Sequence, residues 1–228
     1  MVNLAIIPAR GGSKRIPRKN IRDFLGKPII TYSIETALHS GLFEEIMVST
    51  DDKEIAEIAE KSGAKVPFMR SKKNSNDYAT TMDVINEVLE QYIEKQEKKF
   101  QFVCCIYPTA PLIKTDHLQE GFCKLIAHKY TSVFPAVAFS YPVWRGMEID
   151  VNGATSMIWP EFSNSRSQDL QKVYHDAGQW YWFKNDNLKN WNWPDNTGAI
   201  ILSEELVQDI DTITDWRLAE MKYSLSMK

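Results

Sequence analysis

The chain of 228 residues is 43% hydrophobic and 25% charged, with a formal net charge of -3 at neutral pH. This length supports one substantial core, and the composition excludes a disordered chain. The acidic balance argues against general attraction to nucleic acid or to anionic membranes. Because no apolar run approaches the roughly 20 residues that span a bilayer and the N-terminus lacks a secretory apolar segment, we expect a cytoplasmic protein.

A strand predicted over residues 2–7 leads into a segment with an unusual concentration of positive charge. Gly11 and Gly12 lie within it, and its basic side chains are Arg10, Lys14, Arg15, Arg18, Lys19 and Arg22. A strand that ends in a glycine-containing loop can aim backbone N–H groups at one point, where they bind phosphate oxygens that Lys and Arg neutralise. The basic loop, residues 8–22, therefore predicts a polyphosphate site; a solvated turn that binds nothing is the alternative.

Strands and helices alternate through the rest of the N-terminal half. Strands are predicted at 45–49, 65–69 and 102–107, and the apolar positions of four helices fall within 30–38, 55–59, 82–92 and 118–126. Gly41 is expected to end the first helix and Thr115 to cap the fourth. Such alternation implies a mostly parallel sheet with helices on both faces and ligands at the carboxyl ends of the strands. The basic loop follows the first strand, where that rule places a site.

The helical pattern stops after residue 131. Pro135 interrupts a strand predicted over 132–139, which indicates a bend or an edge position. Asn152-Gly153 predicts the turn of a β-hairpin. Strands predicted at 179–183 and 199–202 flank a loop with Trp191 and Trp193, and a last helix begins near residue 214. Trp180, Tyr181 and Trp182 could form a stacking surface or, as we favour, part of the core.

Two acids, Asp209 and Asp211, precede the last predicted helix. On an extended segment, residues two apart project to the same side, so both carboxylates can face one hard cation. Taken alone, they could equally be exposed or capping acids. Together with a phosphate-binding loop they favour a nucleotide reaction, because Mg²⁺ normally binds through one or two carboxylates plus substrate phosphates.

Two further sites are less informative. His175 and Asp176 are adjacent, so on an extended segment they point in opposite directions and a catalytic dyad does not follow. Arg70 ends a predicted strand, where it could contact a base or a phosphate or be an ordinary surface arginine.

Several blocks of sequence resemble the CMP-sialic acid synthetase (acylneuraminate cytidylyltransferase) family, which activates eight- and nine-carbon keto acids with CTP. The matching blocks occur in the family's order and cover nearly the whole chain: 8–14, 17–20, 48–52, 108–111, 166–168 and 209–212. Within the family, the blocks at 104–111, 166–170 and 174–179 look most like the members that use pseudaminic acid. Tyr107 stands where the N-acetylneuraminate enzymes typically have Gln.

The resemblance implies a Rossmann-like α/β fold with a mostly parallel sheet of the nucleotide-diphospho-sugar transferase type. The chain would form a single nucleotidyltransferase domain, 1–228, with 141–176 inserted as an extended β-hairpin arm that is exchanged in a homodimer. The implied reaction transfers CMP from CTP to the anomeric hydroxyl of a nonulosonic acid, pseudaminic acid, and releases pyrophosphate, with Mg²⁺. Alternatives are N-acetylneuraminate, legionaminate or 3-deoxy-octulosonate as acceptor and, in a different class, a catalytically silent nucleotide-binding module.

The resemblance also assigns roles to individual residues. Catalysis would use Arg10, Lys14 and Lys19, with Asp209 and Asp211 also holding the metal. The nucleotide would contact Ala9, Arg10, Gly11, Lys14, Asn20, Arg70 and Ala79, the last two, with the segment 77–81, reading cytosine. The sugar acid would contact Tyr107, Thr109, Gln179 and Tyr181, together with Arg166 and Gln168 from the partner subunit. Arg15, Arg18 and Arg22 are expected to be a solvated fringe.

Overall fold

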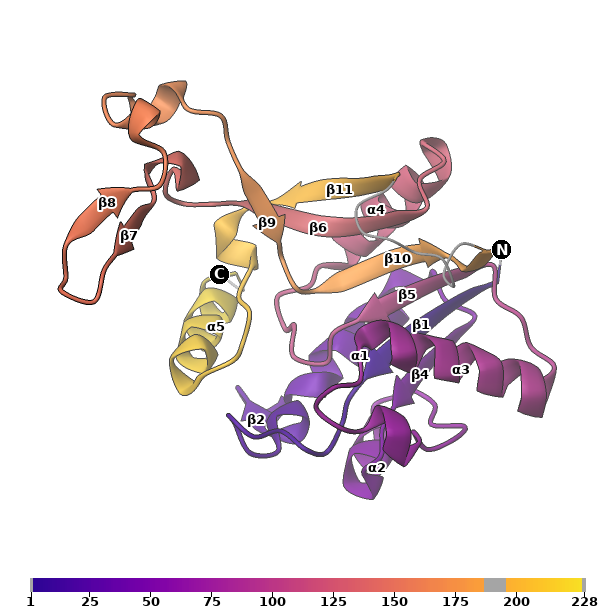
Figure 1. Ribbon diagram of the computed structural model, residues 1–228. Helices are drawn as coiled ribbons and strands as arrows, with labels where there is room; N and C mark the ends of the chain where they lie inside the picture. The colour runs from indigo at the N-terminus through magenta and orange to yellow at the C-terminus, as the bar shows by residue number, and fades with distance from the viewer. Residues whose placement is uncertain (1, 187–195, 227–228) are drawn as a thin grey trace.

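The computed structural model describes residues 2–186 and 196–226, so the expected loop with Trp191 and Trp193 lies outside the described residues. A seven-stranded sheet forms the centre of the molecule (Figure 1), with the order β11-β6-β10-β5-β1-β4 and β9 paired to β6. The parallel strands are β1 (Asn3–Pro8), β4 (Glu45–Ser49), β5 (Phe102–Ile106), β6 (Ser132–Ala138) and β11 (Thr197–Leu202). The antiparallel strands are β9 (Tyr174–Asp176) and β10 (Trp180–Lys184). The predicted mostly parallel α/β sheet is confirmed.

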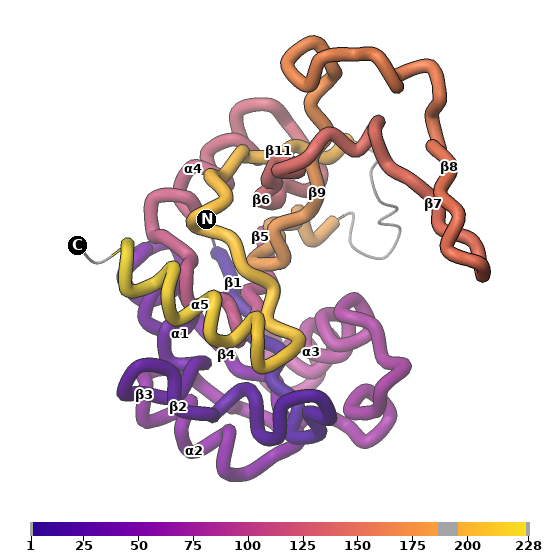
Figure 2. Tube along the Cα trace, turned by 90° about the vertical axis from the view of Figure 1, so that its left-hand side faces the viewer, coloured from indigo at the N-terminus to yellow at the C-terminus, as the bar shows by residue number. Residues whose placement is uncertain are grey.

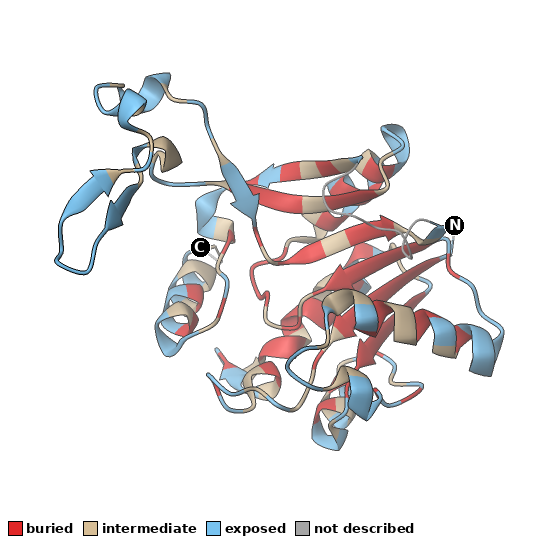
Figure 3. Cartoon of the chain, viewed as in Figure 1, coloured by how far each residue is buried: buried red, intermediate tan, exposed pale blue. Residues whose placement is uncertain are grey.

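Helices cover both faces of this sheet, as the continuous burial of its central strands requires. One face of β1 presents Ala5 and Ile7 to α1 (Ile29–Ser40), α2 (Lys53–Lys61) and α4 (Thr115–Ala127). The other face presents Leu4 and Ile6 to α3 (Thr81–Gln96). The central strands are consequently buried on both sides (Figure 3), which explains why they read as continuous apolar runs.

The last helix, α5 (Ile213–Ser226), packs away from the sheet against the start of the chain. Its Trp216 and Ala219 join Ile16, Phe24 and Ile29 in a third buried cluster. The small hairpin of β2 (Asp23–Phe24) and β3 (Lys27–Pro28) supplies part of this cluster. The C-terminal segment is therefore docked onto the region of the basic loop. Short 3-10 turns complete the described chain: Lys19–Ile21, Lys72–Asn74, Val143–Arg145, Pro160–Phe162, Ser167–Asp169 and Glu204–Leu206.

Local signals set most helix ends. Gly41 closes α1 with a left-handed φ of 65°. Asp52 caps α2 by accepting from the Ile55 N–H at 3.1 Å, and Thr80 forms a reciprocal capping box with Asp83 at the start of α3. Thr115, by contrast, is the first helical residue of α4 and not its cap, because Lys114 occupies the cap position.

Two strand predictions need correction. Residues 65–69 form only an isolated bridge from Lys65 to Met47, because Pro67 lacks the N–H that would continue the ladder. Pro135 lies in an interior strand and not at an edge. On one side of β6, Val133 pairs with β10 and Ala136 pairs with β9. Pro135 lies between these two pairs, so its missing N–H interrupts neither ladder.

Residues 141–173, here called the arm, leave the sheet between β6 and β9 and project from the body (Figures 1 and 2). The arm carries the predicted hairpin, formed by β7 (Met147–Ile149) and β8 (Thr155–Met157). Trp144, Trp159 and Phe162 pack together at its base. The end of the predicted 141–176 insertion, β9, instead returns to the central sheet. Within the described ranges, no helix has the length and apolar character to cross a membrane.

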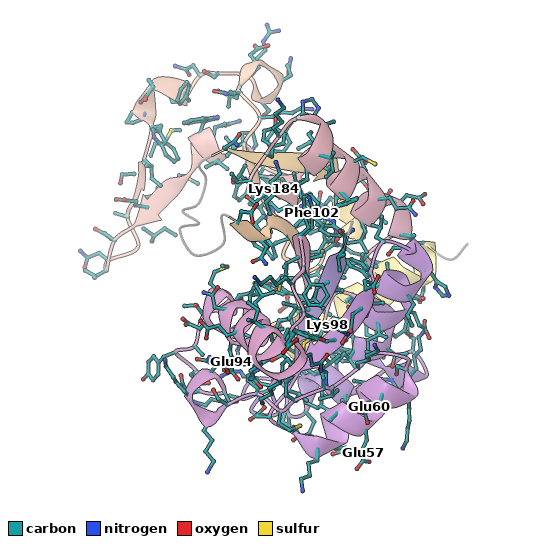
Figure 4. All side chains as sticks on the ribbon, turned by 90° about the vertical axis from the view of Figure 1, so that its right-hand side faces the viewer. Glu57, Glu60, Glu94, Lys98, Phe102 and Lys184 are labelled. Atoms are coloured by element: carbon teal, nitrogen blue, oxygen red, sulfur yellow. The ribbon has the colours of Figure 1, made fainter. Side chains whose placement is uncertain are left out.

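Glu45 is a buried carboxylate at the start of β4. It accepts hydrogen bonds from Tyr92 at 2.6 Å, Lys98 at 2.7 Å and Lys65 at 3.3 Å. Figure 4 views the molecule from the side on which Lys98 lies. It also labels Phe102 on β5 and Lys184 on β10, which pair with each other in the sheet. Burial alone would raise the pKa of the Glu45 carboxyl, but these hydrogen bonds outweigh burial and hold the pKa below its ordinary value.

Replacing this carboxylate should therefore weaken the fold in a pH-dependent way. Glu45→Gln is expected to lower the free energy of unfolding at pH 7 by about 1.5–3 kcal/mol, the range of hydrogen bonds to charged groups. Because the folded pKa is depressed, the charge stabilises the fold above the ordinary carboxyl pKa of about 4.3, and this contribution is lost as the pH falls through the folded value. Urea unfolding of the two proteins from pH 7 to pH 3 should show the difference shrinking. The exposed Glu94→Gln (Figure 4) is the control and should change little at any pH.

Candidate active site

A cavity of about 500 Å³ opens at the carboxyl ends of β1 and β5. Its walls are the basic loop, the segment before α3 and the residues that follow β5. Eight of the residues assigned from the sequence line it: Arg10, Lys14, Lys19, Asn20, Arg70, Ala79, Tyr107 and Thr109. The site thus lies where a parallel sheet is expected to place it.

The turn after β4 holds the start of the basic loop in place. The Ala9 N–H donates to the Ser49 carbonyl at 2.9 Å, and the Gly11 N–H donates to the Asp51 carboxylate at 2.9 Å. A Cβ on Gly11 would lie 2.7 Å from Asp52 Oδ2, so only glycine fits beside that carboxylate. Ala9 and Gly11 do not line the cavity; they fix the path of the loop that does.

Two cations of the basic loop converge on one carboxylate across the cavity. Arg10 Nη1 lies 2.8 Å from Asp77 Oδ1 and also donates to the Asn76 carbonyl at 3.0 Å. Lys14 pairs with the other oxygen of Asp77. The hydrogen bonds from Lys14 and Arg10 hold the pKa of the Asp77 carboxyl below its ordinary value. The sequence placed Asp77 in a base-reading segment but gave no sign of this bridge, which joins positions 67 residues apart.

The third cation, Lys19, reaches the segment that carries the two acids. Its Nζ donates to the Ile210 carbonyl at 2.6 Å and lies 3.8 Å from Asp211 Oδ1. Burial lowers the pKa of the Lys19 ammonium, against the opposing charges of Asp211 and Asp209. Arg15 is largely exposed, as expected, but it also pairs with Asp211 at 2.6 Å and lines the cavity.

The expected metal ligands, Asp209 and Asp211, do not line the cavity, but Asp211 adjoins it through its ion pair with Arg15. Burial raises the pKa of the Asp209 carboxyl, and the neighbouring charge of Asp211 raises it further, as expected for two carboxylates that share one site. Over residues 2–186 and 196–226, no group of three or more His, Cys, Asp or Glu side chains could hold a metal. A cation held by this pair would need ligands from elsewhere, and phosphate oxygens are the usual ones for Mg²⁺.

Arg70 is a buried residue of the cavity wall and not a surface arginine, since only 8% of it is exposed. Its Nε donates to Ser49 Oγ at 3.0 Å, and Nη2 donates to the Ser49 carbonyl. Burial lowers the pKa of its guanidinium. A guanidinium held by neutral oxygens beside a cavity is suited to binding a polar ligand group there.

The expected sugar-binding residues divide into three groups. Tyr107 and Thr109 line the cavity. The Tyr181 ring lies behind Tyr107, with centroids 5.4 Å apart, and its hydroxyl donates to Asp176 at 2.5 Å. Gln179 is only 2% exposed and donates to the Leu206 carbonyl at 2.6 Å, so it braces the chain leading to the acids and does not face the cavity.

Arg166 and Gln168 lie on the arm, and neither lines the cavity of its own chain. Gln168 borders a separate hollow at the base of the arm. The prediction that both residues act in a partner's site is therefore untested by a single chain.

The remaining basic residues, Arg18 and Arg22, are partly or largely exposed, as expected, and they also have structural contacts. Arg18 pairs with Asp52 and, at 2.5 Å, with Glu54, and these contacts fasten the basic loop to α2. The Arg22 guanidinium lies 5.3 Å from the ring centroid of Trp216.

The adjacent His175 and Asp176 do not form a side-chain dyad. Asp176 instead accepts from the Tyr181 hydroxyl and from the Gly178 N–H, and His175 packs against Phe139. The expectation against a catalytic pair is confirmed.

Comparisons with known proteins agree with this geometry. The family model described as cytidylyltransferase matches residues 4–188. The chain is 45% identical to a pseudaminic acid cytidylyltransferase of Campylobacter jejuni, over 99% of this chain and 98% of the relative. It is 34% identical to a CMP-N,N'-diacetyllegionaminic acid synthase of Legionella pneumophila, over 99% and 97% of the two chains. The chain belongs to the cytidylyltransferase family.

A solved structure shares the fold. The CMP:2-keto-3-deoxy-manno-octonic acid synthetase complexed with CTP superposes with a TM-score of 0.71 at 18% identity, over 100% of this chain and 99% of that one. The resemblance to the CMP-sialic acid synthetases and the fold class predicted from the sequence are confirmed.

The two glycines of the basic loop offer a matched pair of variants. Gly11→Ala would force the loop away from Asp52, whereas a Cβ on Gly12 meets no atom within 4 Å. We expect Gly11→Ala to weaken binding of inorganic tripolyphosphate by about tenfold, since small displacements of binding groups carry costs of that order. Gly12→Ala should stay within about twofold. Calorimetric titration measures both, and equal effects of the two substitutions would mean that Asp52 does not set the position of the loop.

Proposed function

We propose that this protein transfers CMP from CTP to the anomeric hydroxyl of a nonulosonic acid, pseudaminic acid, and releases pyrophosphate in the presence of Mg²⁺. The observation that carries the proposal is the meeting of the basic loop with the segment of Asp209 and Asp211, joined by Lys19. The 45% identity to the Campylobacter jejuni enzyme over nearly all of both chains supports the choice of substrates.

The cations of the cavity would supply electrostatic stabilisation. The anomeric oxygen attacks the α-phosphorus while the bond from that phosphorus to the pyrophosphate oxygen breaks, so negative charge accumulates on the leaving group. Arg10, Lys14 and Lys19 would hold the triphosphate in line and bind that charge. Asp209 and Asp211 would hold Mg²⁺, which neutralises further charge on the phosphates.

Other walls of the cavity would select the two substrates. Arg70 and Ala79 lie on the side of the segment before α3, where they would contact the cytosine ring, and Asn20 lies on the side of the phosphates. Asn20 donates to the Arg10 carbonyl at 2.9 Å, so it also keeps the loop folded. Tyr107 and Thr109 would face the sugar acid, with Tyr181 supporting the Tyr107 ring from behind.

The direct test is pyrophosphate release from CTP and Mg²⁺ with each candidate sugar acid in turn. Pseudaminic acid should give the highest kcat/KM. Faster turnover of N-acetylneuraminate, legionaminate or 3-deoxy-octulosonate would leave the reaction type standing and change the acceptor. If no sugar acid releases pyrophosphate, the chain is a nucleotide-binding module and not this enzyme.

The metal-binding role of Asp211 can be separated from a structural one. Asp211→Ala should lower kcat by about 100-fold or more, the usual size of a lost electrostatic contact at the reacting phosphates, with the thermal midpoint little changed. Asp215 is the control, because it accepts from the Thr212 N–H at 2.7 Å at the start of α5. Asp215→Asn should lower stability by about 1 kcal/mol, the usual effect of a lost cap, and retain turnover. Unfolding of the Asp211 variant would mark that residue as structural.

We also propose that the active form is a homodimer with exchanged arms. The hairpin of the arm exposes Met147, Ile149 and Val151, apolar side chains that a second subunit could cover. Arg166 and Gln168 would then reach the sugar carboxylate in the partner's cavity, Arg being suited to a two-point grip.

Mixing two inactive variants tests this exchange. Arg166→Ala and Lys14→Ala should each abolish turnover, and subunit exchange between them should restore about a quarter of wild-type activity, because half of the dimers are mixed and each carries one intact site. Lys14→Ala mixed with Asp211→Ala is the control and should restore none, since both residues belong to the cavity region of one chain. No recovery in the first mixture would contradict exchange.

A further inference from the structure

The carboxylate of Asp77 occupies the place where the cations of the cavity converge. Its two oxygens contact Arg10 and Lys14, which come from the opposite wall, so it closes a bridge across the mouth of the cavity. Like a phosphate group, it offers two anionic oxygens to a guanidinium and an ammonium at once. It is the anion that those two cations bind in this structure.

Asp77 is not needed for the local fold around it. The start of α3 is capped by Thr80 and Asp83, which exchange hydrogen bonds. The preceding turn is shaped by Asn76, whose side chain accepts from the Tyr78 and Ala79 N–H groups. In the described chain, the hydrogen-bond partners of the Asp77 carboxylate are Arg10 and Lys14, and the carboxylate is about 40% exposed. Its side chain is therefore free to leave when a stronger anion arrives.

We propose that the Asp77 carboxylate binds Arg10 and Lys14 in the place of a phosphate group and competes with phosphate for them. The carboxylate holds the two cations before the nucleotide binds and is displaced by the triphosphate. It binds them again as pyrophosphate leaves. This inference rests on the proposed function of the cavity. Any ligand that engages Arg10 and Lys14 must first break their pairs with Asp77, so its apparent affinity is its intrinsic affinity multiplied by the fraction of molecules in which the bridge is open. A ligand that does not reach these cations is unaffected.

This competition predicts which ligands respond to removal of the carboxylate charge. Asp77→Asn should lower the Kd of pyrophosphate and of CTP by about three- to tenfold, the range for two partly exposed ion pairs. The Kd of cytidine, which has no phosphate, should stay within about twofold. In turnover assays, inhibition by added pyrophosphate should become correspondingly stronger, because release of that product is no longer assisted.

Calorimetric titration of the full chain with pyrophosphate, CTP and cytidine provides the test. Glu60→Gln, at an exposed position of α2 on the outer surface (Figure 4), controls for the loss of one negative charge and should leave all three affinities unchanged. Asp77→Ala is the second variant and should behave as Asp77→Asn does. A thermal melt checks that both fold, and failure of both to fold would make Asp77 structural and overturn the proposal.

The other outcomes are equally decisive. Unchanged or weaker pyrophosphate binding by the Asp77 variants would show that the carboxylate does not compete with phosphate. Weaker cytidine binding would identify Asp77 as a contact to the base. If the wild-type chain binds CTP without turning it over with any sugar acid, the proposed reaction fails while the competition by Asp77 can still be measured. If it binds neither CTP nor pyrophosphate, both proposals fail.

Discussion

One hydrogen bond, from Lys19 Nζ to the Ile210 carbonyl, joins positions 191 residues apart and brings the two halves of the site together. Its geometry depends on the burial of Ile16 and Ile210 in the cluster that α5 completes. Gln179 and Lys222 also bond to carbonyls of the chain leading to Asp209. Without this docking, the acids would not lie beside the basic loop, because nothing in the local sequence of either segment holds the other.

The cations that line the cavity are held in place by contacts within the chain. Crowded cations repel one another, and here each is offset by a carboxylate or a carbonyl: Asp77 for Arg10 and Lys14, Asp211 for Arg15, and Ile210 for Lys19. The pairs of Arg10 and Lys14 with Asp77 are partly solvated, so each is weak and can be exchanged for contacts with a more highly charged ligand. A site of this kind folds before substrate arrives and still releases its own counter-ions when substrate binds.

Local patterns predicted much of this fold. The bounds of β4, 45–49, and the end of α1 at Gly41 follow from an apolar run and a capping residue that act over a few positions. The edge position predicted from Pro135 failed because it depended on long-range pairing: the proline is tolerated inside the sheet because the partner strand of β6 changes there. The bridge from Arg10 to Asp77 and the inward turn of Gln179 could not be read from the sequence, since each is fixed by a residue far along the chain.

The central claim is that the basic loop and the acid pair form one site for a triphosphate and its metal. CTP affinity measured with and without saturating Mg²⁺, in the wild type and in Asp209→Asn, tests it most directly. The account predicts that Mg²⁺ tightens CTP binding to the wild type by about tenfold or more, since Mg²⁺ binds through carboxylates and phosphates together, and that the variant loses this gain. An equal gain in both proteins, or none in the wild type, would contradict it.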